Sequence, residues 1–146
     1  MATHELTKDT FRGTVSKQGI VLIDWWAPWC GPCRAFKPIF EAASEQHPDV
    51  TFAKINTDEE EDLASYFDIE AVPTVMVFRD QIGVFSQAGG LPVEALENVI
   101  EQARALDMDQ VRQRIAESEE NEDEGGETDG ADDEEPTDPS TDKSLN

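Results

Sequence analysis

The stretch Trp29-Cys30-Gly31-Pro32-Cys33 decides how this chain folds, and it holds the only two cysteines among 146 residues. Before it runs the nearly continuous apolar segment Ile20–Trp26, which is typical of a central strand covered on both faces. After it, the spacing of apolar residues predicts a helix from Cys33 to about Gln46. The cysteine pair is therefore expected where a buried strand passes into a helix.

This position gives the two cysteines different chemistry. Unpaired N–H groups and the helix dipole favour a negative charge at the start of a helix, and the thiolate is the reactive form of cysteine. We therefore expect Cys30 to attack first. Cys33 lies one turn further, on the same side of the helix, so it can displace a partner from a mixed disulfide on Cys30. Pro32 suits the first helical position, and Gly31 leaves room for another chain to approach.

Two other uses of the pair fit the sequence less well. A structural zinc site needs about four ligands, but the chain offers no third cysteine, and His4 and His47 are far apart in the sequence. A static disulfide between neighbours would close a very short loop and so contribute almost no loop entropy. The pattern therefore favours a redox-active pair over either alternative and predicts no metal site.

Trp-Cys-Gly-Pro-Cys, after a strand that carries Asp-Trp-Trp-Ala-Pro, resembles the active site of the thioredoxin family, in particular its bacterial type. The similarity runs from about Thr3 to about Leu106. It implies an α/β thioredoxin fold, with a central mixed β-sheet flanked by helices on both faces. It also implies a protein-disulfide oxidoreductase that holds no cofactor beyond the redox-active Cys30–Cys33 disulfide. Its partners would be protein disulfide substrates and a thioredoxin reductase that draws on NADPH.

Hydrophobic periodicity predicts the order βαβαβαββα for this part of the chain. The expected strands cover 3–6, 20–26, 50–56, 74–79 and 84–87, and the expected helices cover 8–16, 33–46, a short segment after Asp58, and 93–106. Asp58 and Glu61 fit a capping box at the start of the short helix. The stripe Val93, Leu96, Val99 and Ile100 is expected in the core.

The chain continues past the region of resemblance. Asp107 and Gln110 fit a second capping box, so an extra helix is predicted over 107–117. Residues 118–146 contain almost no apolar residue, and such a segment cannot bury enough surface to offset its ordering entropy. We therefore expect a thioredoxin domain at 1–106, an extra C-terminal helix at 107–117, and a disordered acidic tail at 118–146.

Charge limits the class of partner. The formal net charge is −22, of which residues 117–146 contribute 14 acidic residues against one lysine. An acidic protein repels nucleic acids and anionic membranes, so neither is an expected partner. No signal-peptide pattern and no apolar run of membrane-spanning length are found. A cytoplasmic location is therefore expected, and in such a reducing compartment a cysteine pair is more often catalytic than structural. The protein is also expected to be a monomer.

Two charged residues are candidates for proton transfer. Asp24 interrupts the apolar strand six residues before Cys30, and burial there would raise its pKa. In thioredoxin-like proteins the aspartate at this point accepts and donates a proton for the second cysteine, which implies that Asp24 deprotonates Cys33. The alternative is a buried aspartate with a purely structural role. Lys54 lies on the strand expected beside Asp24 and, by the same resemblance, modulates it; a solvated lysine is the alternative.

The resemblance also implies a docking surface for substrates. The Val72–Pro73 peptide bond would be cis and would face the cysteines, leaving the Val72 backbone free to pair with an extended substrate. Gly89 would complete a flat apolar surface together with Trp29, Pro32 and Val72. A plain turn is the alternative for Gly89.

Two further functions are alternatives for the whole chain. An oxidase or isomerase would use the same chemistry, but the Gly-Pro pair between the cysteines resembles that of the reductases. A chaperone-like or partner-binding module would instead use the acidic tail to recruit a basic partner.

Overall fold

The computed structural model describes the backbone of residues 2–129 and side chains as far as residue 120. The chain forms two units, residues 1–105 and residues 106–146, and each is described by itself.

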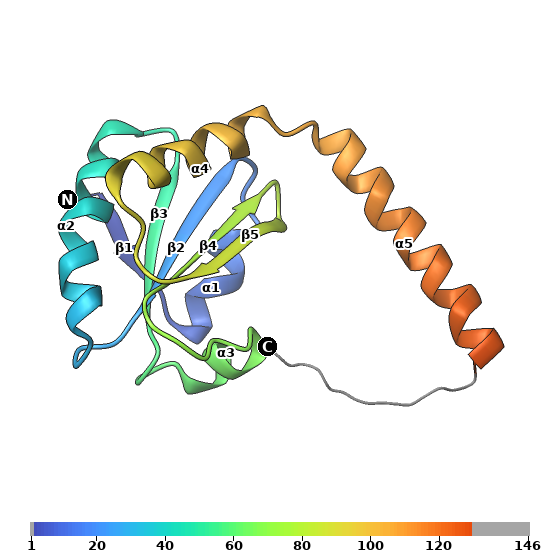
Figure 1. Cartoon of the computed structure of the whole chain (residues 1–146), viewed down its shortest axis with the longest axis horizontal. Coiled ribbons are helices and arrows are strands. Elements are labelled where there is room, and N and C mark those ends of the chain that lie inside the picture. The colour runs from blue at the N-terminus through green and yellow to red at the C-terminus, as the bar shows by residue number, and fades with distance from the viewer. Residues whose placement is uncertain (1, 130–146) are drawn as a thin grey trace. The chain divides into compact units, whose positions relative to one another are not determined.

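The first unit is a mixed five-stranded sheet with helices on both of its faces (Figure 1). Its elements in chain order are β1 (Thr3–Glu5), α1 (Lys8–Val15), β2 (Ile20–Trp26), α2 (Gly31–Gln46), β3 (Thr51–Asn56), α3 (Glu61–Tyr66), β4 (Thr74–Arg79), β5 (Ile82–Ala88) and α4 (Val93–Ala105). The strand order is β1-β3-β2-β4-β5. β1, β3 and β2 run parallel to one another. β4 pairs antiparallel with β2, and β5 pairs antiparallel with β4. The predicted α/β class and mixed sheet are confirmed.

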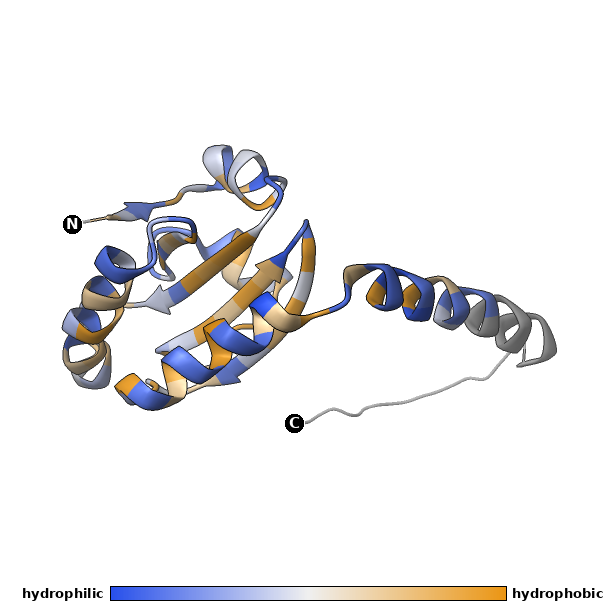
Figure 2. Ribbon diagram, turned by 90° about the horizontal axis from the view of Figure 1, so that it is seen from above, coloured by the Kyte–Doolittle hydropathy of each residue, from blue (hydrophilic) through white to orange (hydrophobic). Residues whose placement is uncertain are grey.

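The sheet is apolar on both faces because its central strands are covered on both sides (Figure 2). Leu22 of β2 enters the core under α2 and α4, whereas Ile23 and Trp25 enter the core under α1 and α3. All three side chains are fully buried. Burying a side chain of this kind stabilises the fold by about 1.5–3 kcal/mol, so β2 holds the two layers together.

Two sequence-based expectations about helices are wrong. α3 begins at Glu61 with Glu60 as its cap, not at Asp58. The Asn56 side chain accepts hydrogen bonds from the backbone N–H groups of residues 58 and 59, so those donors are used before the helix starts. Val93, expected in the core, is 57% exposed. It is the first residue of α4, whereas Leu96 and Ile100 of the same stripe are buried as expected.

The second unit contains α5 (Met108–Asp129). The Asp107 carboxylate accepts a hydrogen bond of 3.2 Å from the backbone N–H of Gln110, which is the expected capping contact. The helix extends past residue 117, so the structure differs from the disorder expected over 118–129. Glutamate, a good helix former, recurs through this stretch. The rest of the predicted tail lies outside the described residues. None of the described helices is long and apolar enough to cross a membrane.

Candidate active site

The cysteine pair lies at the start of α2, as the sequence predicts. Cys30 is the N-cap residue of α2, and Cys33 lies in its first turn. The two form a disulfide with their Cα atoms 5.2 Å apart, and both are nearly buried. The backbone N–H of Cys33 donates a hydrogen bond of 3.1 Å to Sγ of Cys30. Because an N–H donor and the helix dipole both stabilise negative charge, the site favours a thiolate on Cys30.

Two loops at the same end of the sheet, before β4 and after β5, complete the site. The Val72–Pro73 peptide bond is cis, as the resemblance implies, and Sγ of Cys30 lies 3.5 Å from the carbonyl oxygen of Val72. The Gly89 N–H donates a hydrogen bond of 2.7 Å to the Pro73 carbonyl oxygen. Gly89 has φ +99°, in the left-handed region that favours glycine. Gly90 was not among the predicted site residues; a Cβ at this position would come within 3.3 Å of Phe36 Cβ.

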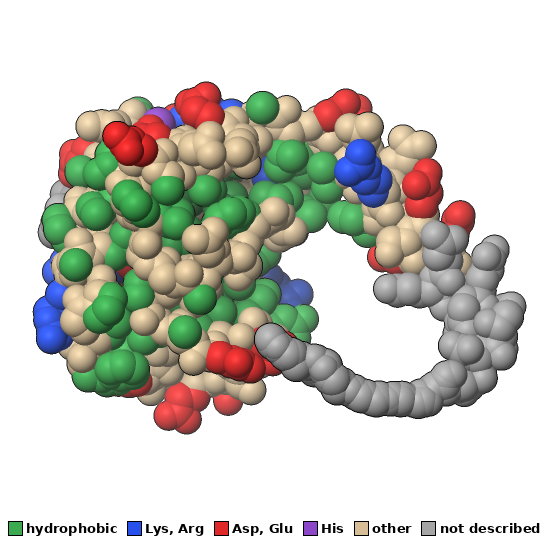
Figure 3. Space-filling view, in the orientation of Figure 1, with side chains coloured by type: hydrophobic (Ala, Val, Ile, Leu, Met, Phe, Trp, Pro, Cys, Tyr) green, Lys and Arg blue, Asp and Glu red, His purple; other side chains and the backbone are tan. Residues whose placement is uncertain are grey.

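The surface around the pair is open. Trp29 is 67% exposed, and its Nε1–H donates a hydrogen bond of 3.3 Å to Asp58 Oδ1. Gly31 and Pro32 are exposed, and a Cβ on Gly31 would meet no atom within 4 Å. Figure 3 shows hydrophobic side chains spread over much of the face of the first unit that is seen in that view.

Asp24 lies inside the sheet layer next to this site. It is 1% exposed, and its Oδ1 is one of two buried side-chain polar atoms without a hydrogen-bond partner in the described part of the chain. Burial raises the pKa of Asp24 from its ordinary value of 3.8 to about 7; Lys54 partly offsets the rise in pKa and Glu5 adds to it. Asp24 therefore carries a proton over much of the range below neutral pH.

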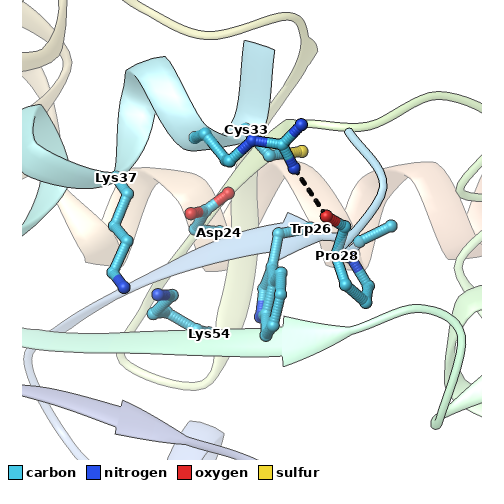
Figure 4. Close-up of a pocket in the computed structure, with 8 residues that line it drawn as sticks. Asp24, Trp26, Pro28, Cys33, Lys37 and Lys54 are labelled. Atoms are coloured by element: carbon cyan, nitrogen blue, oxygen red, sulfur yellow. Dashed lines mark hydrogen bonds between the residues drawn. The ribbon is translucent and has the colours of Figure 1, made fainter. Parts of the chain in front are cut away.

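A cavity of about 250 Å³ connects Asp24 with the second cysteine (Figure 4). Its walls include the C-terminal end of β2 and the first turns of α2. The lining residues are Asp24, Trp26, Ala27, Pro28, Cys33, Arg34, Lys37 and Lys54. Asp24 and Cys33 therefore line one shared cavity.

The structure brings Lys54 beside Asp24, since the two are register partners on β3 and β2. The Lys54 Nζ also lies 5.2 Å from the centroid of the Trp26 ring, a cation–π contact that holds the long side chain over the strand end. Arg34 and Lys37 add two positive charges to the walls of the cavity. Neither residue was predicted from the sequence, although their positions one and four residues after Cys33 place them in the first turns of the helix.

The described residues contain no group of three or more histidine, cysteine or acidic side chains that could hold a metal ion. The arrangement has instead the parts needed for thiol–disulfide exchange. These parts are a cysteine whose negative charge is stabilised, a second cysteine one turn away, and a buried carboxyl group that titrates near neutral pH.

Comparisons with known proteins agree on one family. Residues 2–102 match the family model described as thioredoxin. Over 116 residues, the chain is 51% identical to a putative thioredoxin 2 of Streptomyces coelicolor, covering 80% of this chain and 87% of that protein. It is 40% identical to thioredoxin 1 of Synechococcus elongatus, covering 66% of this chain and 92% of that protein. A solved structure of a mutant thioredoxin from Halobacterium salinarum matches with a TM-score of 0.67 and 33% identity, covering 71% of this chain and 92% of that one.

Proposed function

This chain belongs to the thioredoxin family and is a thiol–disulfide oxidoreductase, and we propose that it reduces protein disulfides in the cytoplasm with electrons from a thioredoxin reductase. The observation that carries the proposal is the hydrogen bond from the Cys33 N–H to Cys30 Sγ at the start of α2. This hydrogen bond stabilises a thiolate on Cys30 in preference to one on Cys33. A reducing compartment is proposed because such a pair must be returned to the dithiol form after each cycle.

The first step is attack by Cys30. Its thiolate forms a bond to one sulfur of the substrate disulfide, and the other substrate sulfur leaves as a thiolate that takes up a proton. Trp29, Gly31 and Pro32 surround the attacking sulfur on the open side. On the other side the backbone of Val72 pairs with the backbone of the substrate, with Pro73 and Gly89 holding that segment in place.

The second step is resolution by Cys33. Asp24 takes the proton of the Cys33 thiol across the shared cavity, and the resulting thiolate attacks Sγ of Cys30. The bond between Cys30 and the substrate breaks, the second substrate sulfur leaves as a thiolate that takes up a proton, and the Cys30–Cys33 disulfide forms. Lys54 favours the ionised form of Asp24 and so helps the carboxyl group to release its proton again.

The cycle closes when the disulfide receives two electrons and two protons. We propose that a thioredoxin reductase supplies them from NADPH, a cofactor of the partner and not of this chain. We further propose that residues 1–106 carry the whole reaction, and that the helix from residue 107 and the acidic segment from residue 118 take no part in it.

The experiment that tests this function is insulin reduction coupled to NADPH oxidation by a purified thioredoxin reductase. Catalytic amounts of the protein should sustain NADPH oxidation, and the Cys30→Ser/Cys33→Ser double variant should not. The rival function, a chaperone-like or recruiting module with an acidic arm, predicts binding of partner proteins with no turnover. Absence of turnover with both the reductase and a chemical dithiol would reject the reductase function.

A further inference from the structure

Three charged residues form a row across the sheet beside the active site. Glu5 of β1 is the register partner of Lys54 on β3, and Lys54 is in turn the register partner of Asp24 on β2. Register partners on neighbouring strands point to the same face of a sheet. The row therefore reads carboxylate, ammonium, carboxylate, from the exposed edge strand to the buried centre.

Trp26 ties the outer carboxylate to the ammonium group. The indole Nε1–H of Trp26 donates a hydrogen bond of 3.1 Å to Glu5 Oε2, and Lys54 Nζ lies over the same ring, 5.2 Å from its centroid. Figure 4 shows the Lys54 and Trp26 side chains next to each other, below Asp24. Glu5 thus fixes the ring on which Lys54 rests, and it offers Lys54 a second negative charge.

We propose that Glu5 is a positioning residue that shares Lys54 with Asp24 and thereby sets the pH at which Asp24 exchanges its proton with Cys33. The proposal rests on the proton-transfer role proposed above for Asp24. Glu5 itself touches neither cysteine; it acts on the reaction through Lys54 and through its own charge.

The electrostatics of the site point the same way. The negative charge of Glu5 raises the pKa of Asp24, and the positive charge of Lys54 lowers it. Lys54 also lowers the pKa of Glu5. Partial desolvation has the larger effect, so the pKa of Glu5 is raised overall although the residue is classed as exposed. The single ammonium group therefore interacts with both carboxyl groups. Because water screens an exposed charge more than a buried one, Glu5 should have a smaller effect on Asp24 than Lys54 has.

Other charged or titratable groups near the row are few and can be held constant. From α2, Cys33, Arg34 and Lys37 face the same cavity as Asp24. From the loop after β3, the charge of Glu59 raises the pKa of Glu5. In the disulfide form Cys33 does not titrate. A titration of the oxidised protein therefore reports the carboxyl groups without a contribution from the thiol.

The test follows the carboxyl carbon of Asp24 by NMR in the oxidised protein as pH is varied. Glu5→Gln keeps an oxygen acceptor for Trp26 Nε1 and removes only the charge. It should move the midpoint of Asp24 to lower pH, whereas Lys54→Gln should move it to higher pH and by more. In the Lys54→Gln background, Glu5→Gln should have a smaller effect than in the wild type, because part of its action runs through Lys54. Glu101→Gln, which removes an exposed carboxylate near the end of α4, should leave the midpoint unchanged.

An Asp24 midpoint that is the same in Glu5→Gln and the wild type would overturn the proposal. So would an equal shift in the presence and absence of Lys54. The pH profile of insulin reduction separates this outcome from failure of the proposed function. If the Asp24 midpoint shifts but the rate profile does not follow it, the positioning of Lys54 by Glu5 stands, and the role of Asp24 in catalysis is rejected.

Discussion

The backbone N–H of Cys33 donates a hydrogen bond to Sγ of Cys30, so one cysteine of the pair stabilises negative charge on the other. The reverse contact does not exist, because Cys30 is the cap residue and its own N–H donates to the Ala27 carbonyl oxygen. Cys33 instead faces the cavity that contains Asp24. Two side chains of the same type thus acquire different reactivities from their positions in one helical turn.

The Asp24→Asn variant should resolve mixed disulfides more slowly than the wild type. Asparagine fills the same space but cannot accept the Cys33 proton, and loss of a general base typically costs on the order of a hundredfold in rate. Rapid-quench measurement of substrate release from the Cys30 mixed disulfide reports this step, while KM for insulin should change little. Wild-type rates of release across the pH range would show that Asp24 is only structural.

Asp24 should also make the stability of the oxidised protein depend on pH. The pKa of Asp24 is about 7 in the folded protein, against an ordinary value of 3.8. Between these two pH values the folded state therefore holds a proton that the unfolded state has released. The stability that this proton supports is full below the lower value and is lost as pH rises through the upper one. The gap corresponds to on the order of 4 kcal/mol.

Urea unfolding of Asp24→Asn and of the wild type at a series of pH values measures this effect. The two proteins should be similar near pH 4, and the variant should become the more stable one as pH approaches 8. A difference in free energy of unfolding that stays constant over this range would contradict the high pKa of Asp24.

The Gly31→Val variant should lose activity toward proteins without losing stability. Added carbon atoms at Gly31 meet nothing within the molecule but occupy the space through which a substrate approaches Cys30. A badly packed contact costs about 1–3 kcal/mol, so kcat/KM for insulin should fall about tenfold, while reduction of a small aromatic disulfide should not change. Gly13→Val is the matched control, because its Cβ is also unobstructed and lies on α1. An equal loss in both variants would reject the docking role of Gly31.

Truncation after Glu117 should leave folding and catalysis intact. Beyond this residue the chain contains only two hydrophobic residues, Ala131 and Leu145, so it adds almost nothing to a core. Its negative charges act at long range and are screened within about 10 Å at moderate salt. The melting temperature and insulin reduction at physiological salt should equal those of the full chain. A large fall in either one would mean that the segment packs on the catalytic domain or contacts the substrate.

Much of this structure follows from local sequence patterns. The bounds of β2 and β4 are predicted correctly from apolar runs, which are strong where a strand is buried on both faces. The cysteine pair and Asp24 are identifiable because reactive residues stand out in an apolar context. The start of α3 is predicted at the wrong residue, because the Asn56 side chain accepts hydrogen bonds from the backbone N–H groups of residues 58 and 59 and holds this stretch in a turn before the helix begins.

Other features depend on contacts between distant segments, and no local pattern indicates them. Trp26 reaches Glu5 only because β1 and β2 both pair with β3 in a fixed register. The tight space at Gly90 arises from the close approach of Phe36, more than fifty residues earlier in the chain. The cis bond before Pro73 is expected from family resemblance alone, since the base rate for such bonds is low.

The most direct test of the asymmetry between the two cysteines is covalent trapping with a disulfide-containing protein substrate. Cys33→Ser keeps the backbone N–H that stabilises the Cys30 thiolate and removes the resolving sulfur, so it should accumulate a mixed disulfide on non-reducing gels. Cys30→Ser carries the same number of thiols but should trap little or none. Trapping by Cys30→Ser and not by Cys33→Ser would contradict the assignment of Cys30 as the attacking residue.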